Sequence, residues 1–162
     1  MRRNGFTLIE ILVVVAIIGL LLSIAGLKFS SMSKKGHIER QTRELYADLM
    51  TVRSDALFQK KPRRVVISAA GFSVYSSAAD TVGPLSTKTF TYAVTTAPTA
   101  LKIDVGSNGV VTFNEDSTNL NAVVCTQKAS AASVDSIAMT QTQVQIGQQN
   151  SSGCSFGNIT IR

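Results

Sequence analysis

The 162-residue sequence predicts an α+β protein in which one long N-terminal helix packs on an antiparallel β-sheet or a small β-sandwich. Three observations predict this fold class. A nearly continuous apolar run lies close to the N-terminus, and apolar residues at helical spacing follow it. After Pro62 the pattern changes to short strand-like segments separated by glycine, serine and asparagine.

The apolar run extends from Ile11 to Leu27 and follows a single acid, Glu10. A helix over residues 6–27 would be roughly 33 Å long, which is enough to cross the hydrocarbon core of a bilayer. A carboxylate in lipid costs about 3 kcal/mol on insertion scales, so such residues usually have a function and a partner. The sequence therefore predicts a transmembrane assembly helix over 6–27, with Glu10 as its functional residue.

The helix is predicted to continue over residues 28–61 as an amphipathic segment. Apolar residues recur there at spacings of seven, four, three and four, namely Ile38, Leu45, Leu49, Val52 and Ala56. Pro62 ends the helix because proline disfavours helical geometry in the residue before it.

Residues 62–162 are predicted to form a β-rich globular domain that packs on this apolar stripe. Segments 64–68 and 72–75 flank Ala70-Gly71 and form a predicted hairpin. Further strands are expected at 89–94, 101–105, 110–114, 134–140 and 156–161. Exposed loops are expected within 126–153, which is rich in Ser, Thr, Ala and Gln.

The segment Gly5-Phe6-Thr7-Leu8-Ile9-Glu10, preceded by Arg2 and Arg3, resembles the processing and assembly motif of type IV pilins and type II secretion pseudopilins. The resemblance implies that residues 1–5 are a leader. A prepilin peptidase would cleave between Gly5 and Phe6 and N-methylate Phe6. Glu10 would then pair with the amino terminus of a neighbouring subunit. That pairing would remove two charges that are costly in an apolar bundle.

The same resemblance implies the partners and the location of the protein. The partners would be other pilin or pseudopilin subunits, the prepilin peptidase and the inner-membrane assembly platform. The chain would cross the bacterial inner membrane once, with its N-terminus in the cytoplasm and its globular domain in the periplasm. It would then enter a pilus or pseudopilus.

A second resemblance lies at the end of the predicted helix and in the hairpin. The segments Leu45-Tyr46-Ala47-Asp48-Leu49, Arg53-Ser54-Asp55-Ala56-Leu57 and Val65-Val66-Ile67 resemble the GspH/FimT family of minor pilins and pseudopilins. This similarity implies a minor subunit that acts in initiation or at the tip of the filament.

An ordinary secretory signal peptide is the main alternative at the N-terminus. Arg2 and Arg3 would be its basic region, and Ser23-Ile24-Ala25 would be its cleavage site. The released product would be a secreted β-domain that begins at Gly26. Glu10, which interrupts the apolar region, argues against this alternative, as does the continuation of the run past Ala25.

Two cysteines, Cys125 and Cys154, lie in the part of the chain that would be exported. Two thiols in an oxidising compartment most simply form one disulfide. A metal site is the alternative, but no histidine lies near either cysteine. Many pilins close a C-terminal loop with such a bond, which agrees with the disulfide.

The formal net charge is +6, and a basic cluster follows the predicted helix. DNA binding in uptake, as in some related minor pilins, is a weaker alternative function, and its candidate residues are Lys60, Lys61, Arg63, Arg64 and Arg162. The competing interpretation is a solvated helix end, where the helix dipole favours cations.

No enzyme, cofactor or metal site is predicted. The single histidine, His37, has no partner at a triad-like position, and we expect it to be solvated. The residues Asp104, Asn108, Gly109 and Glu115 match four positions of an EF-hand loop. Gly106 occupies the third position, however, and a strand pattern follows, so a plain hairpin turn is predicted.

Overall fold

The computed structural model describes residues 6–76, 83–114, 120–127, 132–150 and 153–162, and within these the side chains of 24–28 are left aside. The chain divides into two compact units, Met1–Lys35 and Gly36–Arg162. One helix, α1 (Leu8–Gln59), contributes residues to both units. Each unit is described by itself.

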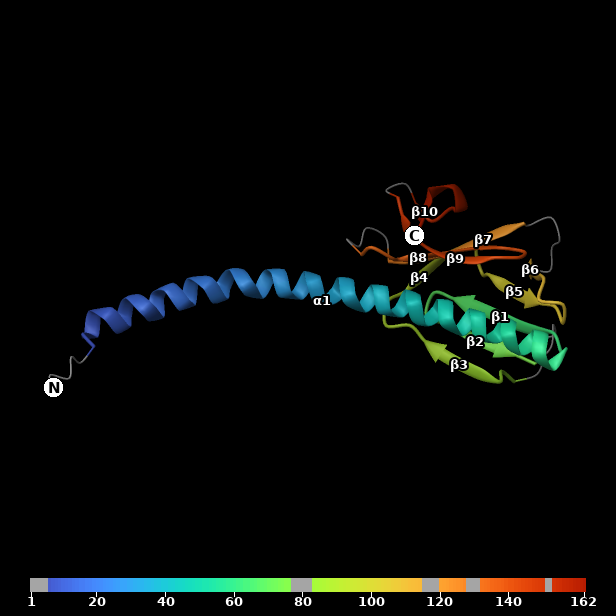
Figure 1. Ribbon diagram of the computed structural model, residues 1–162, viewed down its shortest axis with the longest axis horizontal. Coiled ribbons are helices and arrows are strands. Elements are labelled where there is room, and N and C mark those ends of the chain that lie inside the picture. The colour runs from blue at the N-terminus through green and yellow to red at the C-terminus, as the bar shows by residue number, and fades with distance from the viewer. Residues whose placement is uncertain (1–5, 77–82, 115–119, 128–131, 151–152) are drawn as a thin grey trace. The chain divides into compact units, whose positions relative to one another are not determined.

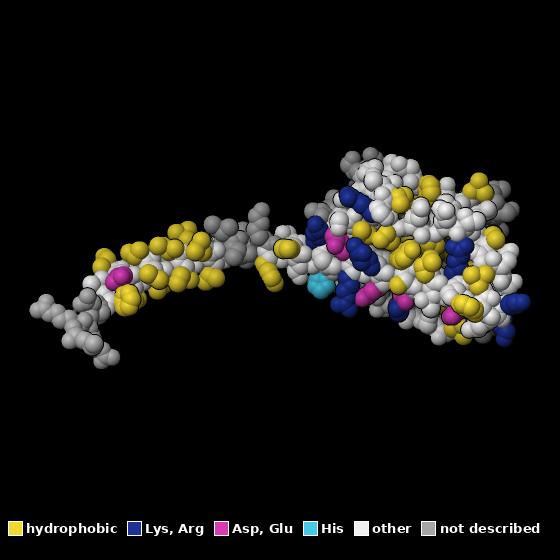
Figure 2. Space-filling model, viewed as in Figure 1, with side chains coloured by type: hydrophobic (Ala, Val, Ile, Leu, Met, Phe, Trp, Pro, Cys, Tyr) yellow, Lys and Arg dark blue, Asp and Glu magenta, His cyan; other side chains and the backbone are white. Residues whose placement is uncertain are grey.

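In the first unit, the described side chains of α1 are largely apolar and exposed, from Leu8 to Leu22 and again at Phe29 and Met32. Figure 2 shows these side chains in yellow along the helix. No helical stretch among the described residues combines the length and the apolarity that a membrane span requires.

In the second unit, α1 buries the apolar stripe that the sequence predicted, and this prediction is confirmed for Ile38, Leu45, Leu49, Val52 and Ala56. The helix ends at Gln59, close to the predicted end, and Lys60 has a left-handed φ of 50°. Pro62 follows directly before the first strand.

The β-rich part contains two five-stranded antiparallel sheets among the described residues (Figure 1). The order of the first sheet is β3 (Ser86–Thr89), β2 (Gly71–Tyr75), β1 (Arg63–Ser68), β5 (Lys102–Val105) and β6 (Val111–Phe113). The order of the second is β10 (Ile159–Ile161), β9 (Val144–Gln149), β8 (Ser136–Thr140), β7 (Asn121–Thr126) and β4 (Val94–Ala97). A short 3₁₀ helix, η1 (Phe156–Asn158), precedes β10.

A single hydrophobic core joins α1 to both sheets. Val65 and Ile67 of β1 and Ile137 of β8 are almost completely buried in it, and Phe113 of β6 is fully buried. Side chains alternate along a strand, so β1 presents Val65 and Ile67 to the core from the same face. The predicted α+β arrangement of a long helix on antiparallel sheet is therefore confirmed.

Polar contacts fix α1 where the second unit begins; we name the contacts of Glu39, Gln41 and Thr42 the collar contacts. Ser133 donates to Glu39 Oε1 from both its backbone nitrogen, at 2.8 Å, and its hydroxyl, at 2.7 Å. Gln41 donates to the backbone oxygen of Tyr92 at 2.7 Å and accepts from its nitrogen at 2.9 Å. The buried hydroxyl of Thr42 bonds that of Thr126 in β7 at 3.1 Å.

Several strand predictions are confirmed and others are wrong. The hairpin of β1 and β2 is confirmed, with Ser68 opposite Gly71. The predicted strand 89–94 is wrong, because its ends belong to β3 and β4 and the residues between them include Tyr92, which bonds α1 instead. The expected strand 156–161 is shorter than predicted because η1 occupies its first half.

The segment 126–153 is predicted to hold exposed loops besides the predicted strand 134–140; that strand is confirmed as β8, whereas β9 is a strand that the prediction missed. In β8, Ser136, Ile137, Ala138 and Met139 are all buried. The strand β8 lies between β7 and β9 and is buried on both faces, so it does not show the apolar and polar alternation of a half-exposed strand.

Candidate assembly site at the start of the N-terminal helix

The start of α1 is organised by Thr7. The backbone nitrogen of Glu10 donates to Thr7 Oγ1 at 3.3 Å and to the carbonyl oxygen of Thr7 at 3.1 Å. Thr7 is therefore the N-cap, and Thr7-Leu8-Ile9-Glu10 has the spacing of a capping box. Glu10 lies in the first turn, where the helix dipole favours a negative charge.

Glu10 is exposed, and so are the apolar side chains around it, Leu8, Ile9, Ile11 and Leu12. No hydrogen bond or ion pair of its carboxylate is recorded within the described residues. An acid among exposed apolar groups needs an opposite charge as soon as those groups leave water. Phe6 is exposed and precedes the helix, whereas the predicted cleavage residue Gly5 lies outside the described residues.

The basic residues that the sequence grouped together do not form one surface. Lys60 and Lys61 are exposed after the end of α1, and Arg63 donates to Gln59 Oε1 in that helix. Arg162 belongs to the C-terminal segment and donates to Gln148 Oε1 at 2.6 Å. Figure 1 shows the C-terminus well away from the end of α1.

Arg64 is buried rather than displayed, with only 4% of its side chain exposed. Its Nε donates to Asp104 Oδ1 at 2.6 Å and its Nη2 donates to Oδ2 at 2.8 Å. The two residues are register partners in β1 and β5. This two-pronged ion pair occupies Arg64, so a phosphate-binding role for it would require breaking the pair.

We expect Arg64→Ala to lower the free energy of unfolding by about 3 kcal/mol, because it leaves the Asp104 carboxylate without its partner in a mostly buried position. Arg63→Ala removes a half-buried side chain of the same strand that bonds the uncharged Gln59, and it should change the free energy of unfolding by only about 0.5–1 kcal/mol. Urea denaturation followed by circular dichroism measures both. Equal effects of the two substitutions would contradict this role of the ion pair.

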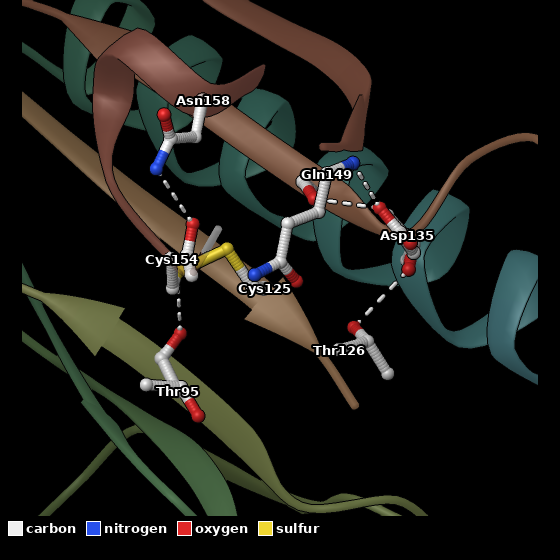
Figure 3. Close-up of a disulfide and its surroundings, with 10 residues drawn as sticks. Thr95, Cys125, Thr126, Asp135, Gln149, Cys154 and Asn158 are labelled. Carbon is white, nitrogen blue, oxygen red and sulfur yellow. Dashed lines mark hydrogen bonds between the residues drawn. A yellow bond between two sulfur atoms is a disulfide. The ribbon is translucent and has the colours of Figure 1, made fainter. Parts of the chain in front are cut away.

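The predicted disulfide is confirmed: Cys125 of β7 is bonded to Cys154, 29 residues later. Figure 3 shows the bond beside Thr95 of β4, and Cys154 Sγ lies 3.4 Å from the Thr95 carbonyl oxygen. Next to it, the buried Asp135 accepts from the backbone nitrogen of Gln149 at 2.7 Å. The bond thus ties the segment after β9 to the second sheet.

The residues of the EF-hand-like pattern form a plain turn between β5 and β6, as predicted. Asn108 Oδ1 accepts from the nitrogen of Val110 at 3.1 Å, and Gly109 has a φ of 77°, which favours glycine. Asp104 is held by Arg64, and Glu115 lies outside the described residues. His37 is exposed, as expected.

Sequence reasoning did not find the collar contacts. Glu39 and Gln41 appear in the sequence as ordinary polar residues of a helix, and their partners Ser133 and Tyr92 are distant in the chain. One signal was available: Thr42 lies one turn after Ile38 and interrupts the apolar stripe with a hydroxyl group.

Comparisons with known proteins agree with the helix and the fold. Residues 1–26 match the family model of the prokaryotic N-terminal methylation motif. The structure is similar to a crystal structure of the Pseudomonas aeruginosa type IV minor pilin FimU, with a TM-score of 0.56 and 15% identity, over 76% of this chain and 96% of that chain. A second crystal form of FimU gives a TM-score of 0.52 and 17% identity, over 72% of this chain and 95% of that chain. No curated protein matches the sequence.

The fold is therefore the pilin fold, with a long N-terminal helix packed on antiparallel sheets as in FimU. The methylation motif and this fold together support a type IV pilin or pseudopilin superfamily for the chain. The chain thus combines a prokaryotic N-terminal methylation motif over residues 1–26 with a fold similar to that of FimU.

Proposed function

We propose that this chain is a structural, non-enzymatic minor pilin or pseudopilin that is cleaved between Gly5 and Phe6 and enters a filament through its N-terminal helix. The observation that carries the proposal is Glu10, an exposed acid in the first turn of α1 among exposed apolar side chains. Cleavage at Gly5 would create a new α-ammonium group on Phe6, about one helical turn from this acid.

Pairing between subunits follows from electrostatics. When the apolar helices pack side by side, each Glu10 and each α-ammonium group would lose its hydration. An ion pair between the acid of one subunit and the amine of its neighbour neutralises both charges. Such a pair adds little net stability compared with an apolar contact, but removing one partner costs several kcal/mol. Glu10 therefore sets the axial register of the subunits.

The remaining parts of the proposal are the location, the partners and the role. Residues 6–27 anchor the chain in the bacterial inner membrane before assembly, with the globular domain in the periplasm. Its partners are other pilin-like subunits, a prepilin peptidase and an inner-membrane assembly platform. The similarity to the minor pilin FimU favours a minor subunit, in initiation or at the tip, over the main fibre protein.

DNA binding is the weaker candidate function. The burial of Arg64 and the position of Arg162 leave the exposed Lys60 and Lys61 and the half-buried Arg63 as the candidate residues near the end of α1. Solvation and the helix dipole favour cations at the C-terminal end of a helix, so these three residues can be explained without a ligand. No contact in the described residues favours a nucleic acid over that interpretation.

The mass of the mature protein tests the processing step. We expect a chain that begins at Phe6 and carries one additional methyl group. Gly5→Arg should keep its leader, because the peptidase would meet a large charged side chain at the cleavage site. Gly19→Ala is the matched control and should be processed normally, since nothing lies within 4 Å of a Cβ at Gly19. A mature chain beginning at Gly26 would overturn the proposal.

A further inference from the structure

Two large apolar side chains remain exposed on α1 beyond the apolar run: Phe29 is 76% exposed and Met32 is 75% exposed. They are three residues apart, so they lie on the same side of the helix. Lys34 and Lys35 follow within one turn, and no ion pair or hydrogen bond of either is recorded within the described residues. An aromatic and a methionine side chain are thus displayed next to two lysines.

The position of this group along the helix can be compared with the thickness of a membrane. Phe29 lies 21 residues after Leu8, the first residue of α1, which corresponds to about 32 Å of helix. The hydrocarbon core of a bilayer is about 30 Å thick. If Leu8 lies at one face of the core, Phe29 reaches the opposite interface, and Lys34 and Lys35 extend into the headgroup layer.

We propose that Phe29, Met32, Lys34 and Lys35 form a docking site for the anionic surface of the bilayer, which holds the unassembled subunit at a defined depth. The inference rests on the proposed membrane anchor and adds a lipid class to it. Aromatic rings favour the interface between hydrocarbon and headgroups. Lysines next to a membrane helix attract anionic headgroups. The apolar pair, Phe29 and Met32, therefore matches the interface at which the helix length places it. The two lysines match the headgroup layer beyond that interface.

Charge complementarity favours a lipid surface over a second protein helix as the occupant. Two lysines and no acid occur between Phe29 and Lys35. A copy of the same segment would bring four lysines together, and like charges oppose such an approach. An anionic headgroup layer offers phosphates to both lysines while the apolar side chains enter the hydrocarbon edge. Incorporation into a filament would then require the subunit to release these lipids.

A single tryptophan tests the depth, because the natural chain contains none. The full mature chain is reconstituted in vesicles of phosphatidylcholine and phosphatidylglycerol. The indole introduced by Phe29→Trp should show blue-shifted emission and strongest quenching by bromine near the carboxyl end of the acyl chains. The indole introduced by Ile17→Trp should be quenched most by bromine near the chain ends, at the centre of the bilayer.

Energy transfer tests the lipid class. Transfer from the Phe29→Trp indole to dansyl-labelled phosphatidylglycerol should exceed transfer to an equally labelled zwitterionic lipid. Lys34→Gln and Lys35→Gln should each lower the apparent affinity for the anionic lipid by about fivefold. High salt should lower it as well, since it screens charges at a surface. The matched control for the Lys34→Gln/Lys35→Gln double variant is Lys60→Gln with Lys61→Gln, which removes the same two charges just beyond the C-terminal end of α1 and should change nothing.

The outcomes separate this inference from the proposed function. Water-like emission from Phe29→Trp with deep quenching of Ile17→Trp would overturn the docking site and leave the anchor intact. Equal transfer to anionic and zwitterionic lipids would also overturn it. Blue-shifted emission from the Phe29→Trp indole without quenching by any brominated lipid would show that another protein chain covers the site. That result would overturn the proposal that the site binds the bilayer surface. Water-like emission at both positions would overturn the membrane anchor itself.

Discussion

Glu10→Ala should nearly abolish incorporation of the protein into filaments while leaving its insertion in the membrane intact. The substitution would leave the amine of a neighbouring subunit without its partner in an apolar bundle, which costs about 3–5 kcal/mol. That cost corresponds to a loss of about 10² to 4 × 10³-fold in incorporation, at about 1.4 kcal/mol for each factor of ten. Insertion should not suffer, because the substitution removes a charge from an apolar helix.

The measurement is the amount of the protein in sheared filaments relative to the amount in the membrane fraction. Glu44→Ala is the matched control: it also removes one carboxylate from α1, but at an exposed ion pair with Arg40, where little stability is at stake. Wild-type incorporation of the Glu10→Ala protein would contradict the register role. Equal loss for both variants would show that the effect comes from charge in general.

Removal of the disulfide should give the second-largest effect. For Cys125→Ala with Cys154→Ala, we expect the free energy of unfolding to fall by about 3–4 kcal/mol, because the bond closes a loop with a sequence separation of 29. Alanine is preferred to serine because Cys125 is buried and a hydroxyl there would need a hydrogen-bond partner. Urea denaturation of the full chain in detergent measures the change.

The reduced wild-type protein provides the control, since it should lose about as much stability as the double variant. The loss should be local in part: hydrogen exchange should accelerate most in β10 and in residues 153–158, and least in the hairpin of β1 and β2. Unchanged stability after reduction would show that hydrogen bonds alone hold the C-terminal segment.

The helix could be predicted from the sequence because its signals are local. The apolar stripe from Ile38 to Ala56 repeats at helical spacing, and Pro62 marks the end, so the structure differs by only a few residues. The cysteine pair was predictable because two cysteines allow only one intramolecular bond. Glu10 stood out in the sequence because a charge in an apolar run is unusual.

The second sheet could be predicted only in part. Its central strand β8 lies within the predicted strand 134–140, but β7 and β9 on either side of it were not predicted. The burial of β8 on both faces depends on these two neighbours and is therefore a property of the tertiary structure. Arg64 appeared to belong to an exposed cluster with Arg63, yet the alternation of strand β1 turns the two side chains to opposite faces. Its partner Asp104 lies 40 residues away.

The collar contacts have a mechanical consequence for a subunit in a filament under load. Tension transmitted along α1 towards the globular domain meets Ile38, the first residue of the apolar stripe, together with the bonds of Glu39, Gln41 and Thr42, before it reaches the rest of the stripe from Leu45 to Ala56. Several hydrogen bonds over about one turn share such a force, and they can reform after a brief rupture. We therefore expect the hydrogen bonds of the collar contacts to break before the rest of the apolar core unfolds when the filament is stretched.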